Sequence, residues 1–399
     1  MSSVLAGIRV LDFGRYIAGP YCAAVLGDFG AEVIRIDRLG GGEDRFVMPV
    51  GTSGGGAVFL QSNRNKRSIA LDIDKPQGRE VVRRLVRSAD VVVVNMPPQT
   101  LLDLGLDYDT LSQIRPDIIV TTASAFGSTG PNRNKTGLDG IGQCLSGAVY
   151  LSGTADHPTK AMVPYVDFGT ALACAMGTIA ALYERKTSGK GQHVEGSLLN
   201  TALTIASNSL IEEGVLNVGR EAIGNRTRYG SPSDIFRVRD GWIMVQVIGQ
   251  STFKRWTRLI ARPDLFEDPR LQTDLARGDH GEELSGLMGQ WCATRTREEA
   301  LNELERSKIP AGPVQSPRQV LDDPHVKAEG ILQPTDYPGL ARPAPLVKMP
   351  VTLSRTPGEI RHRAPLVGEH TDAILQEAGY GADEIAHMRQ LGLVGGIAA

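Results

Sequence analysis

Two short apolar runs near the start of the chain, Ile8-Arg-Val-Leu-Asp-Phe13 and Glu32-Val-Ile-Arg-Ile36, flank residues 20–29, whose apolar positions have helical spacing. Further along, Asp90-Val-Val-Val-Val94 and Asp117-Ile-Ile-Val-Thr-Thr122 are nearly continuous apolar runs, which is typical of strands buried on both faces. Strands that alternate with helices predict a parallel sheet covered by helices on both faces. The sequence therefore predicts an α/β fold.

The same alternation continues to about residue 216. Residues 192–196 have the pattern of one more strand. Helical spacing recurs in 75–88, 109–115, 139–150, 167–186 and 197–216.

A smaller α+β domain is predicted after Gly230. Residues 233–239 and 242–248 predict a hairpin joined at Asp240-Gly241, because Asp-Gly accepts the positive φ that tight hairpin turns require. Helical patterns follow in 253–260, 282–292 and 297–305.

The last quarter of the chain is less regular. Prolines are frequent from Pro310 to Pro365 and periodicity is weak, which predicts a long connecting path over the surface. Amphipathic helices are expected at 368–378 and 383–390. The predicted organisation is a large domain (1–200), a linker (201–229), a small domain (230–310), a return linker (311–365) and helices that complete the large domain (366–399).

Composition narrows the choice of partners and compartment. The 399 residues include 43 basic and 45 acidic ones without a long block of like charge, which argues against nucleic acid and anionic membranes as partners. The four cysteines are far apart, so neither a zinc site nor a redox pair is expected. No secretion signal or membrane-length apolar run is apparent, and we expect a reduced, cytoplasmic protein.

Several common catalytic motifs are missing. Neither a P-loop nor a G-x-G-x-x-G motif is present, so a Rossmann-like large domain would lack the usual dinucleotide fingerprint. Gly51-Thr-Ser-Gly-Gly55 fits the nucleophile-elbow pattern, but it lacks the preceding strand and following helix. No two histidines have metalloprotease spacing, and we expect no metal.

Carboxylates are therefore the natural candidates for covalent or acid/base chemistry. Asp167 stands at the start of a long helix of mostly small apolar residues. As the N-cap it would accept hydrogen bonds from the unpaired amides of the first turn, which is a purely structural role. That position would also keep the carboxylate ionised, and an ionised carboxylate beside an apolar wall can act as a nucleophile.

The sequence resembles the class III CoA-transferases, a family that includes formyl-CoA transferase, carnitine CoA-transferase and the 2-methylacyl-CoA racemases. The likeness covers almost the whole chain, and the order and spacing of its motifs make it specific. The motifs are Val10-Leu-Asp-Phe-Gly-Arg-Tyr-Ile-Ala-Gly-Pro-Tyr21, Leu26-Gly-Asp-Phe-Gly-Ala-Glu-Val-Ile-Arg-Ile-Asp37, Asn63-Arg-Asn-Lys-Arg-Ser-Ile-Ala-Leu-Asp72, Asp90 to Asn95, Gln143-Cys-Leu-Ser-Gly147 and the block from Asp167 to Leu198.

The resemblance implies a catalytic role for Asp167 as the nucleophile that attacks an acyl-CoA thioester. It implies that Asp139 lies near this nucleophile, although Asp139 can also be an N-cap of its own helix. The remaining residues implied to line the reacting centre are Arg15, Tyr16, Ile17 and Ala18 in one loop and Gly249 in the small domain. Backbone amides of the loop would bind the oxyanion.

Coenzyme A enters as part of the acyl-CoA substrate. The positions that match CoA contacts of the family are Arg38, Leu71, Lys75, Asn95 and Lys135. Arg226 or Arg228 is a candidate to bind the far carboxylate of a dicarboxylic acyl group, because guanidinium is a planar bidentate donor. An exposed loop is the alternative for these two arginines.

The predicted activity is CoA transfer between small carboxylic acids, with dicarboxylic acids as the expected class, through an aspartyl-CoA thioester. Intramolecular CoA transfer uses the same chemistry, and a non-catalytic CoA-binding protein is a third alternative. Racemase activity is disfavoured, because Leu138 stands where racemases carry a catalytic histidine and leucine cannot abstract a proton. The family also implies an interlocked, ring-like homodimer.

Overall fold

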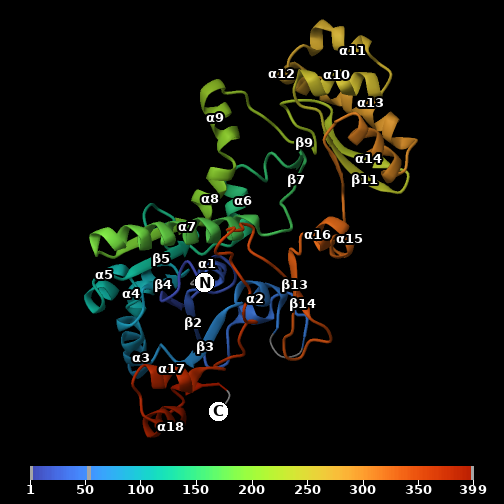
Figure 1. The fold of residues 1–399 in the computed structure, drawn as a ribbon. Coiled ribbons are helices and arrows are strands. Elements are labelled where there is room, and N and C mark those ends of the chain that lie inside the picture. The colour runs from blue at the N-terminus through green and yellow to red at the C-terminus, as the bar shows by residue number, and fades with distance from the viewer. Residues whose placement is uncertain (1–2, 52–54, 397–399) are drawn as a thin grey trace. The chain divides into compact units, whose positions relative to one another are not determined.

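The computed structural model describes residues 3–51 and 55–396, which form two compact units (Figure 1). Unit 1 comprises Met1–Ser146, Ala161–Glu212 and Glu329–Ala399. Unit 2 comprises Gly147–Lys160 and Glu213–Ala328. The chain therefore leaves unit 1 twice and returns to it twice.

Unit 1 is built on a sheet whose described strands follow the order β15-β3-β2-β1-β4-β5-β8. All neighbouring pairs are parallel except β15 with β3. The predicted parallel sheet is confirmed. Its strands are β1 (Arg9–Asp12), β2 (Glu32–Asp37), β3 (Lys66–Leu71), β4 (Val91–Val94), β5 (Ile119–Ser124), β8 (Gln192–Ser197) and β15 (Val394–Gly395).

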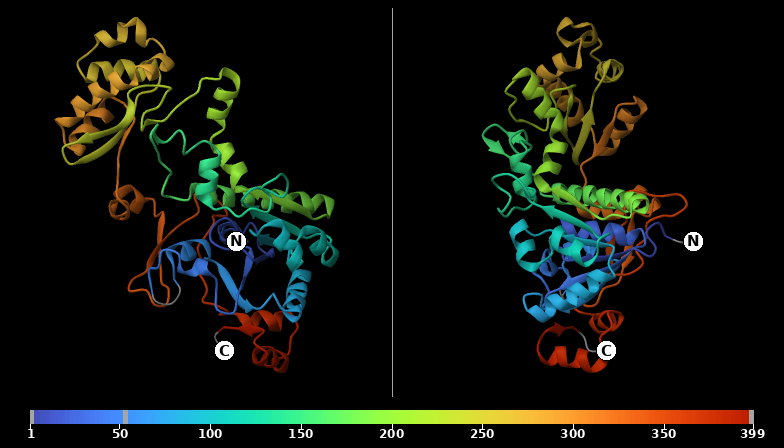
Figure 2. Two further views of the ribbon diagram at one scale, coloured as in Figure 1. Left: turned by 180° about the vertical axis from the view of Figure 1, so that it is seen from behind. Right: turned by 90° about the vertical axis from the view of Figure 1, so that its left-hand side faces the viewer.

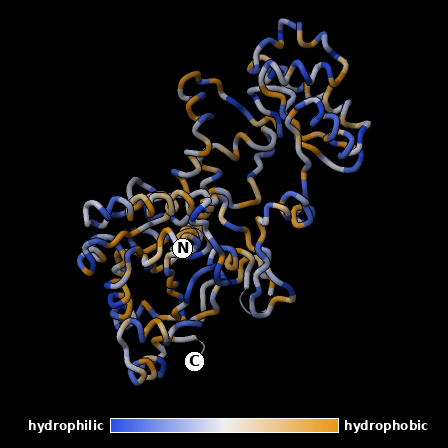
Figure 3. Tube along the Cα trace, in the orientation of Figure 1, coloured by the Kyte–Doolittle hydropathy of each residue, from blue (hydrophilic) through white to orange (hydrophobic). Residues whose placement is uncertain are grey.

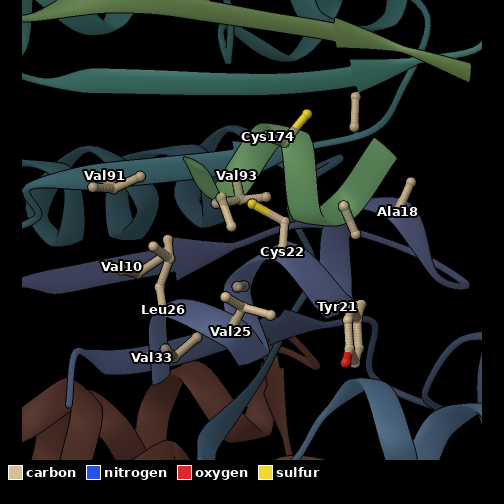
Figure 4. Close-up of a cluster of buried hydrophobic side chains, with 14 of the residues drawn as sticks. Val10, Ala18, Tyr21, Cys22, Val25, Leu26, Val33, Val91, Val93 and Cys174 are labelled. Carbon is tan, nitrogen blue, oxygen red and sulfur yellow. The ribbon is translucent and has the colours of Figure 1, made fainter. Parts of the chain in front are cut away.

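Alternate residues of the strands face two separate cores, as the pleat of a sheet requires. On one face Val10, Val33 and Val93 pack against α1 (Ala18–Asp28) and α7 (Tyr165–Ser188), as Figure 4 shows. On the other face the strands contact α3 (Pro76–Arg87), α5 (Tyr108–Ile114) and the C-terminal helices α17 (Thr371–Glu377) and α18 (Ala382–Gln390), which are red in Figure 2.

The other helices of unit 1 are short. They connect strands or lie at the carboxyl edge of the sheet. Their bounds are α2 (Ala57–Ser62), α4 (Pro98–Leu104), α6 (Asp139–Leu145), α8 (Leu198–Ile205), most of α9 (Ser207–Leu216) and the 3-10 turn η1 (Glu43–Phe46).

Unit 2 contains the predicted hairpin of β10 (Ser233–Val238) and β11 (Gly241–Gln246), extended by β12 (Ala311–Pro313). The hairpin is confirmed, but the predicted turn is wrong by one residue. Val238 pairs with Gly241, so Arg239 and Asp240 form the loop, and Gly241 does not have a positive φ.

Helices of unit 2 cover this small sheet around Phe253, Trp256 and Leu284. They are α10 (Gln250–Leu259), α11 (Asp264–Glu267), η2 (Pro269–Leu271), α12 (Asp274–Asp279), α13 (Gly281–Ala293) and α14 (Arg297–Arg306). Unit 2 also includes α15 (Pro317–Asp322) and α16 (Pro324–Ala328), neither of which contains a buried residue. A second small sheet consists of β6 (Gly153–Thr154), β7 (His157–Pro158) and β9 (Ile223–Gly224).

The Pro-rich region 310–365 is more structured than its sequence predicts. It carries β12, α15, α16 and a second hairpin of β13 (Leu332–Thr335) and β14 (Ala344–Val347). Pro317 and Pro324 are first residues of helices, where the missing N–H has no cost. Leu346 and Tyr337 are buried against α2, but most residues of this region are exposed, which agrees with the predicted path over the surface.

Two predicted helices have different bounds in the structure. The helix expected at 139–150 ends at Leu145, and the next residues, from Gly147, belong to unit 2. The helix expected at 197–216 is divided at Ala206 into α8 and α9. Apolar spacing alone does not register such interruptions, because it persists on both sides of a break.

Helix α7 is apolar along most of its length, with charged residues near its C-terminal end (Figure 3). Among the described helices it is the one whose length and composition match a membrane span, and 50% of its most apolar window is buried inside the fold. Core helices pass the same test, and the packing of α7 on α1 fits a core helix.

Buried charges lie beneath the carboxyl ends of β1, β2 and β3. Asp37 accepts hydrogen bonds from Arg35 (2.9 Å), Arg45 (2.5 Å) and the Ser68 hydroxyl (2.7 Å). Burial by itself would raise the pKa of Asp37, but the two guanidinium groups outweigh it and hold this pKa well below its usual range. The chain here is held by ion pairs rather than by apolar contacts alone.

We predict that Asp37→Asn lowers the free energy of unfolding at pH 7 by about 3–5 kcal/mol, because it leaves two buried guanidinium groups undercompensated. A lowered folded pKa means that this stabilisation is present above the unfolded pKa of about 4 and is lost as the pH falls below it. Urea denaturation at pH 7 and at pH 3.5 measures both effects. The exposed Asp336→Asn is the control, and equal stability of wild type and Asp37→Asn at pH 7 would contradict the assignment.

Candidate active site

Asp167 occupies the third position of α7, whose N-cap residue is Pro164. Pro164 provides no side-chain hydrogen bond to the helix. The alternative that Asp167 is itself the N-cap is therefore wrong. The first turn of α7 needs another source of hydrogen-bond acceptors for its unpaired amides.

Asp139 supplies these acceptors from a different helix. Its Oδ2 accepts hydrogen bonds from the amides of Val166 (2.8 Å) and Asp167 (3.1 Å). Asp139 is the first residue of α6, yet it caps α7 rather than its own helix. The predicted proximity of Asp139 to Asp167 is confirmed by this contact.

Gln143 holds Asp139 in place. Its side-chain amide donates to Asp139 Oδ1, and its carbonyl oxygen accepts from the Ala161 amide (3.0 Å). Gln143 is buried and was not among the predicted site residues. The signal that could have found it is its position one helical turn after Asp139, where side chains share a face.

The Asp167 carboxylate is buried, and no described residue donates a hydrogen bond to it. The residue is 8% exposed, and its side chain accepts no hydrogen bond from the described part of the chain. Burial, followed by the negative charge of Asp139, raises the pKa of Asp167 to about 7. The expectation that the helix would keep this acid strongly ionised is wrong, because Asp139 takes the amides that would have stabilised its charge.

The segment of Arg15, Tyr16, Ile17 and Ala18 leads into α1. Helix α1 packs beside α7, with the ring centroids of Tyr21 and Phe168 4.8 Å apart. The Arg15 guanidinium donates to the carbonyls of Phe13, Gly14 and Ile36, so its donors are engaged with the strand ends. Tyr16 is partly exposed and adopts a φ of 62°, the left-handed region.

Helix α1 begins with unpaired amides. Ile17 is its N-cap residue and provides no side-chain hydrogen bond. Within the described residues, the N–H groups of Ile17, Ala18 and Gly19 have no hydrogen-bond partner. Such groups at a helix N-terminus attract negative charge.

The residues predicted to contact CoA are spread along the carboxyl edge of the sheet. Arg38 follows β2, Leu71 ends β3 and Asn95 follows β4, while Lys135 lies in the connection after β5. In open α/β sheets ligands bind at this edge. The structure therefore brings these positions to one edge, and their contact with CoA stays a prediction.

Their local contacts differ. Arg38 is exposed, with Glu43 3.9 Å away, and Lys135 is exposed. Lys75 forms an ion pair with Asp72 (3.3 Å) and donates to the Gly392 carbonyl (3.1 Å). Leu71 is buried.

Three predicted site residues belong to unit 2. Gly249 precedes α10 with a φ of 82°, and its N–H donates to both carboxylate oxygens of Asp274, 3.0 Å away. Arg226 donates to the Ile223 carbonyl (3.2 Å), and Arg228 donates to the Glu221 carbonyl (3.1 Å). Asp274 was not among the predicted residues, and no sequence motif marks its contact with Gly249.

Cys174, the metal-ligating residue types and Ser53 are the other groups that could carry chemistry. Burial raises the pKa of Cys174, two turns along α7 from Asp167, to about 12. Among residues 3–51 and 55–396 no group of His, Cys, Asp or Glu is arranged to hold a metal. Ser53, of the possible nucleophile elbow, lies outside the described residues.

A large cavity of unit 1 lies next to α7. It measures about 1290 Å³ and is lined by Tyr21 of α1, Phe168 and Leu172 of α7, and parts of the segment 329–352. Asp167 is not among its lining residues.

A family model described as CoA-transferase family III matches residues 5–371. The chain belongs to CoA-transferase family III. The resemblance derived from the sequence motifs is thereby confirmed, and the protein is an enzyme of this family.

Relatives of this family III CoA-transferase match over nearly their full length. The succinyl-CoA–D-citramalate CoA-transferase of Chloroflexus aurantiacus is 32% identical, and the match covers 96% of each chain. The succinate–glutarate CoA-transferase of Agrobacterium fabrum is 32% identical over 94% of this chain and 95% of the relative. A crystal structure of a CaiB/BaiF family protein from Brucella suis superposes with a TM-score of 0.83 and 30% identity, covering 95% of this chain and 100% of that one.

We predict that Asp167→Asn stabilises this family III CoA-transferase at pH 8 but not at pH 4. The folded pKa of about 7 exceeds the ordinary value of Asp, so ionising Asp167 costs stability progressively as the pH rises from about 4 to 7. The expected gain at pH 8 is on the order of 3–4 kcal/mol. Thermal and urea unfolding at the two pH values measure it, and an equal effect at both would refute the buried-carboxylate interpretation.

We predict that the charge of Asp139 accounts for part of this effect. Asp139→Asn keeps a carbonyl oxygen for the Val166 and Asp167 amides but removes the negative charge that raises the pKa of Asp167. In the Asp139→Asn background, Asp167→Asn should therefore give a smaller stabilisation at pH 8. A double-mutant cycle measures the coupling, and strict additivity would contradict it.

Proposed function

We propose that this enzyme moves CoA between small dicarboxylic acids through an aspartyl-CoA thioester on Asp167. The observation that carries the proposal is the buried carboxylate that accepts no hydrogen bond from the described residues and has a pKa of about 7. Such a group is more nucleophilic than a solvated carboxylate. The named substrates of the relatives, D-citramalate with succinyl-CoA and glutarate with succinate, support a dicarboxylic substrate class.

In the first half of the reaction, an Asp167 oxygen attacks the thioester carbonyl of the donor. The C–S bond breaks, so that a mixed anhydride forms and CoA leaves as the thiolate. The thiolate then attacks the Asp167 carbonyl carbon and releases the donor acid as its carboxylate. The second half repeats these steps in reverse with the acceptor acid, and because each step exchanges one activated acyl group for another, no ATP is required.

The unpaired amides of Ile17 and Ala18 are proposed to bind the oxyanion of each tetrahedral intermediate. Ile17 has an apolar side chain, so the backbone alone would provide these hydrogen bonds. In the same proposal, the CoA moiety follows the carboxyl edge along Arg38, Leu71, Lys75 and Lys135, whereas the side chain of Asn95 is engaged with the backbone of Arg15. Gly249 would shield the reacting centre, and Arg226 or Arg228 would bind the distal carboxylate of the acyl group.

We also propose that the enzyme is a cytoplasmic, interlocked homodimer. Several helices of unit 1 carry exposed large apolar side chains, and monomeric proteins rarely expose extensive apolar surface. The residues are Leu138, Ile141, Leu145, Met176, Tyr183, Ile205, Leu210 and Ile211. A second copy of the chain would cover them.

The test is to incubate the enzyme with a panel of acyl-CoAs that includes succinyl-CoA, quench it, and search by intact mass for a CoA adduct on Asp167. Asp167→Ala should abolish both the adduct and transfer to an acceptor acid, by at least about 10³-fold in rate. Asp336→Ala, which removes an exposed carboxylate elsewhere, is the matched control.

Two outcomes would overturn the proposal. Normal turnover by Asp167→Ala would exclude the covalent mechanism. Exchange of solvent deuterium into the α-carbon without acyl exchange would show a racemase or isomerase instead. Turnover of a single dicarboxylic acid without an added acceptor would identify the intramolecular form of the same chemistry.

A further inference from the structure

Asn95 holds the loop before α1 by two hydrogen bonds to one backbone residue. Its Oδ1 accepts from the Arg15 amide (2.8 Å), and its Nδ2 donates to the Arg15 carbonyl (2.7 Å). The two residues are brought together because β1 and β4 are parallel neighbours, so that the segments after Asp12 and Val94 leave the same edge of the sheet. Each polar atom of the Asn95 side chain therefore already has a partner in the loop.

The residue after Arg15 is the one that needs this support. Tyr16 adopts a left-handed φ of 62°, which is unfavourable for a residue with a Cβ. Immediately after it, α1 begins with the unpaired amides of Ile17 and Ala18. The direction in which these amides point is therefore set by a strained turn that Asn95 holds from one side.

Asn95 also contacts the first turn of α1. A methyl group on Gly19 would lie 3.3 Å from Cβ and Cγ of Asn95 and 3.1 Å from the Gly14 Cα. This is closer than most Cβ contacts, so α1 packs tightly on the Asn95 side chain. A side chain held on both sides in this way fixes the loop and the helix start together.

We propose that Asn95 is a positioning residue that holds the Arg15–Tyr16 turn so that the amides of Ile17 and Ala18 face the reacting carbonyl. This rests on the proposed function, in which those amides bind the oxyanion. Asn95 then acts through the loop and not through a hydrogen bond from its side chain to CoA. We call the two hydrogen bonds between Asn95 and the Arg15 backbone the Asn95 clamp. Loss of this clamp would lower the rate of the chemical steps without weakening CoA binding.

The test compares Asn95→Ala and Asn95→Asp with wild type in steady-state transfer from succinyl-CoA to a dicarboxylic acceptor. We expect kcat to fall about 10–100-fold in both variants, with the KM for succinyl-CoA within about 3-fold of wild type. Asn95→Asp is nearly isosteric, so it remains informative if Asn95→Ala does not fold. It replaces the donor that faces the Arg15 carbonyl by an oxygen.

Gln61→Ala is a matched control. Gln61 forms the same pair of hydrogen bonds with Val347, donating to its carbonyl (2.9 Å) and accepting from its amide (3.0 Å), and its side chain has no hydrogen bond with residues 15–19. Its loss should leave kcat within about 2-fold of wild type. A comparable loss of kcat in Gln61→Ala would mean that any such clamp matters, which would overturn a specific role for Asn95.

The results also separate a positioning role from direct contact. A raised KM for succinyl-CoA with unchanged kcat, strongest in Asn95→Asp because its charge would repel CoA phosphates, would show that Asn95 contacts CoA and would overturn the proposal. Unchanged kcat and KM in both variants would overturn it as well. If wild type transfers CoA to no acceptor, the proposed function itself fails, and the two failures are distinguished by the wild-type assay.

Discussion

Two carboxylates compete for the amides at one helix N-terminus, and Asp139 takes them. Because Asp139 accepts from Val166 and Asp167, the first turn of α7 is satisfied without the side chain of Asp167. Asp167 is left buried beside a like charge and accepts no hydrogen bond from residues 3–51 and 55–396. Burial and the charge of Asp139 raise its pKa to about 7. A residue that would otherwise be an inert helix cap thereby becomes a basic carboxylate.

The position of that helix depends in turn on a rigid sheet. The last residues of β1 and β2 are held by buried pairs, Asp12 with Lys66 of β3 (2.6 Å) and Asp37 with Arg35 (2.9 Å). Burial lowers the pKa of Lys66 to about 8, even though Asp12 opposes the shift. Ionised groups that are fully buried tolerate little displacement, since an unpaired buried charge is costly. The loops that leave this edge therefore start from fixed points.

Much of the fold follows from apolar periodicity. The Val-rich run that ends at Val94 and the run at 117–122 are recognisable because both faces of these strands are buried. Strand β3 was not predicted from this pattern, since it begins Lys66-Arg67-Ser68 and two of these polar residues are buried with partners. Charged residues are usually exposed, but a charged residue in an ion pair can be buried. The sequence does not show such a pair, because the partner is known only from the folded structure.

The candidate site shows the same limit. The resemblance of motifs singled out Asp167 and Asp139, and the structure brings them into contact. What the sequence could not predict is which helix Asp139 caps, because residues 27 and 28 positions away in the chain provide the amides. The basicity of Asp167 depends on that tertiary detail. Gln143 and Asp274 were missed for the same reason, since the amides of Ala161 and Gly249 that they bind are backbone groups that carry no sequence signature.

The packed helices α1 and α7 differ in whether the amides of their first turns have hydrogen-bond acceptors. In α7 the amides of the first turn are occupied by Asp139, whereas in α1 the N-cap is Ile17, which has no acceptor, and Pro20 has no N–H to contribute. Within the described residues, the Asp167 carboxylate therefore receives no hydrogen bond from a helix amide, while the amides of Ile17, Ala18 and Gly19 have no partner. In the proposed reaction negative charge leaves the carboxylate and develops on the thioester oxygen. Hydrogen-bond donors are absent at the Asp167 carboxylate and present for the thioester oxygen. This arrangement stabilises the transition state more than the ground state, which is what catalysis requires.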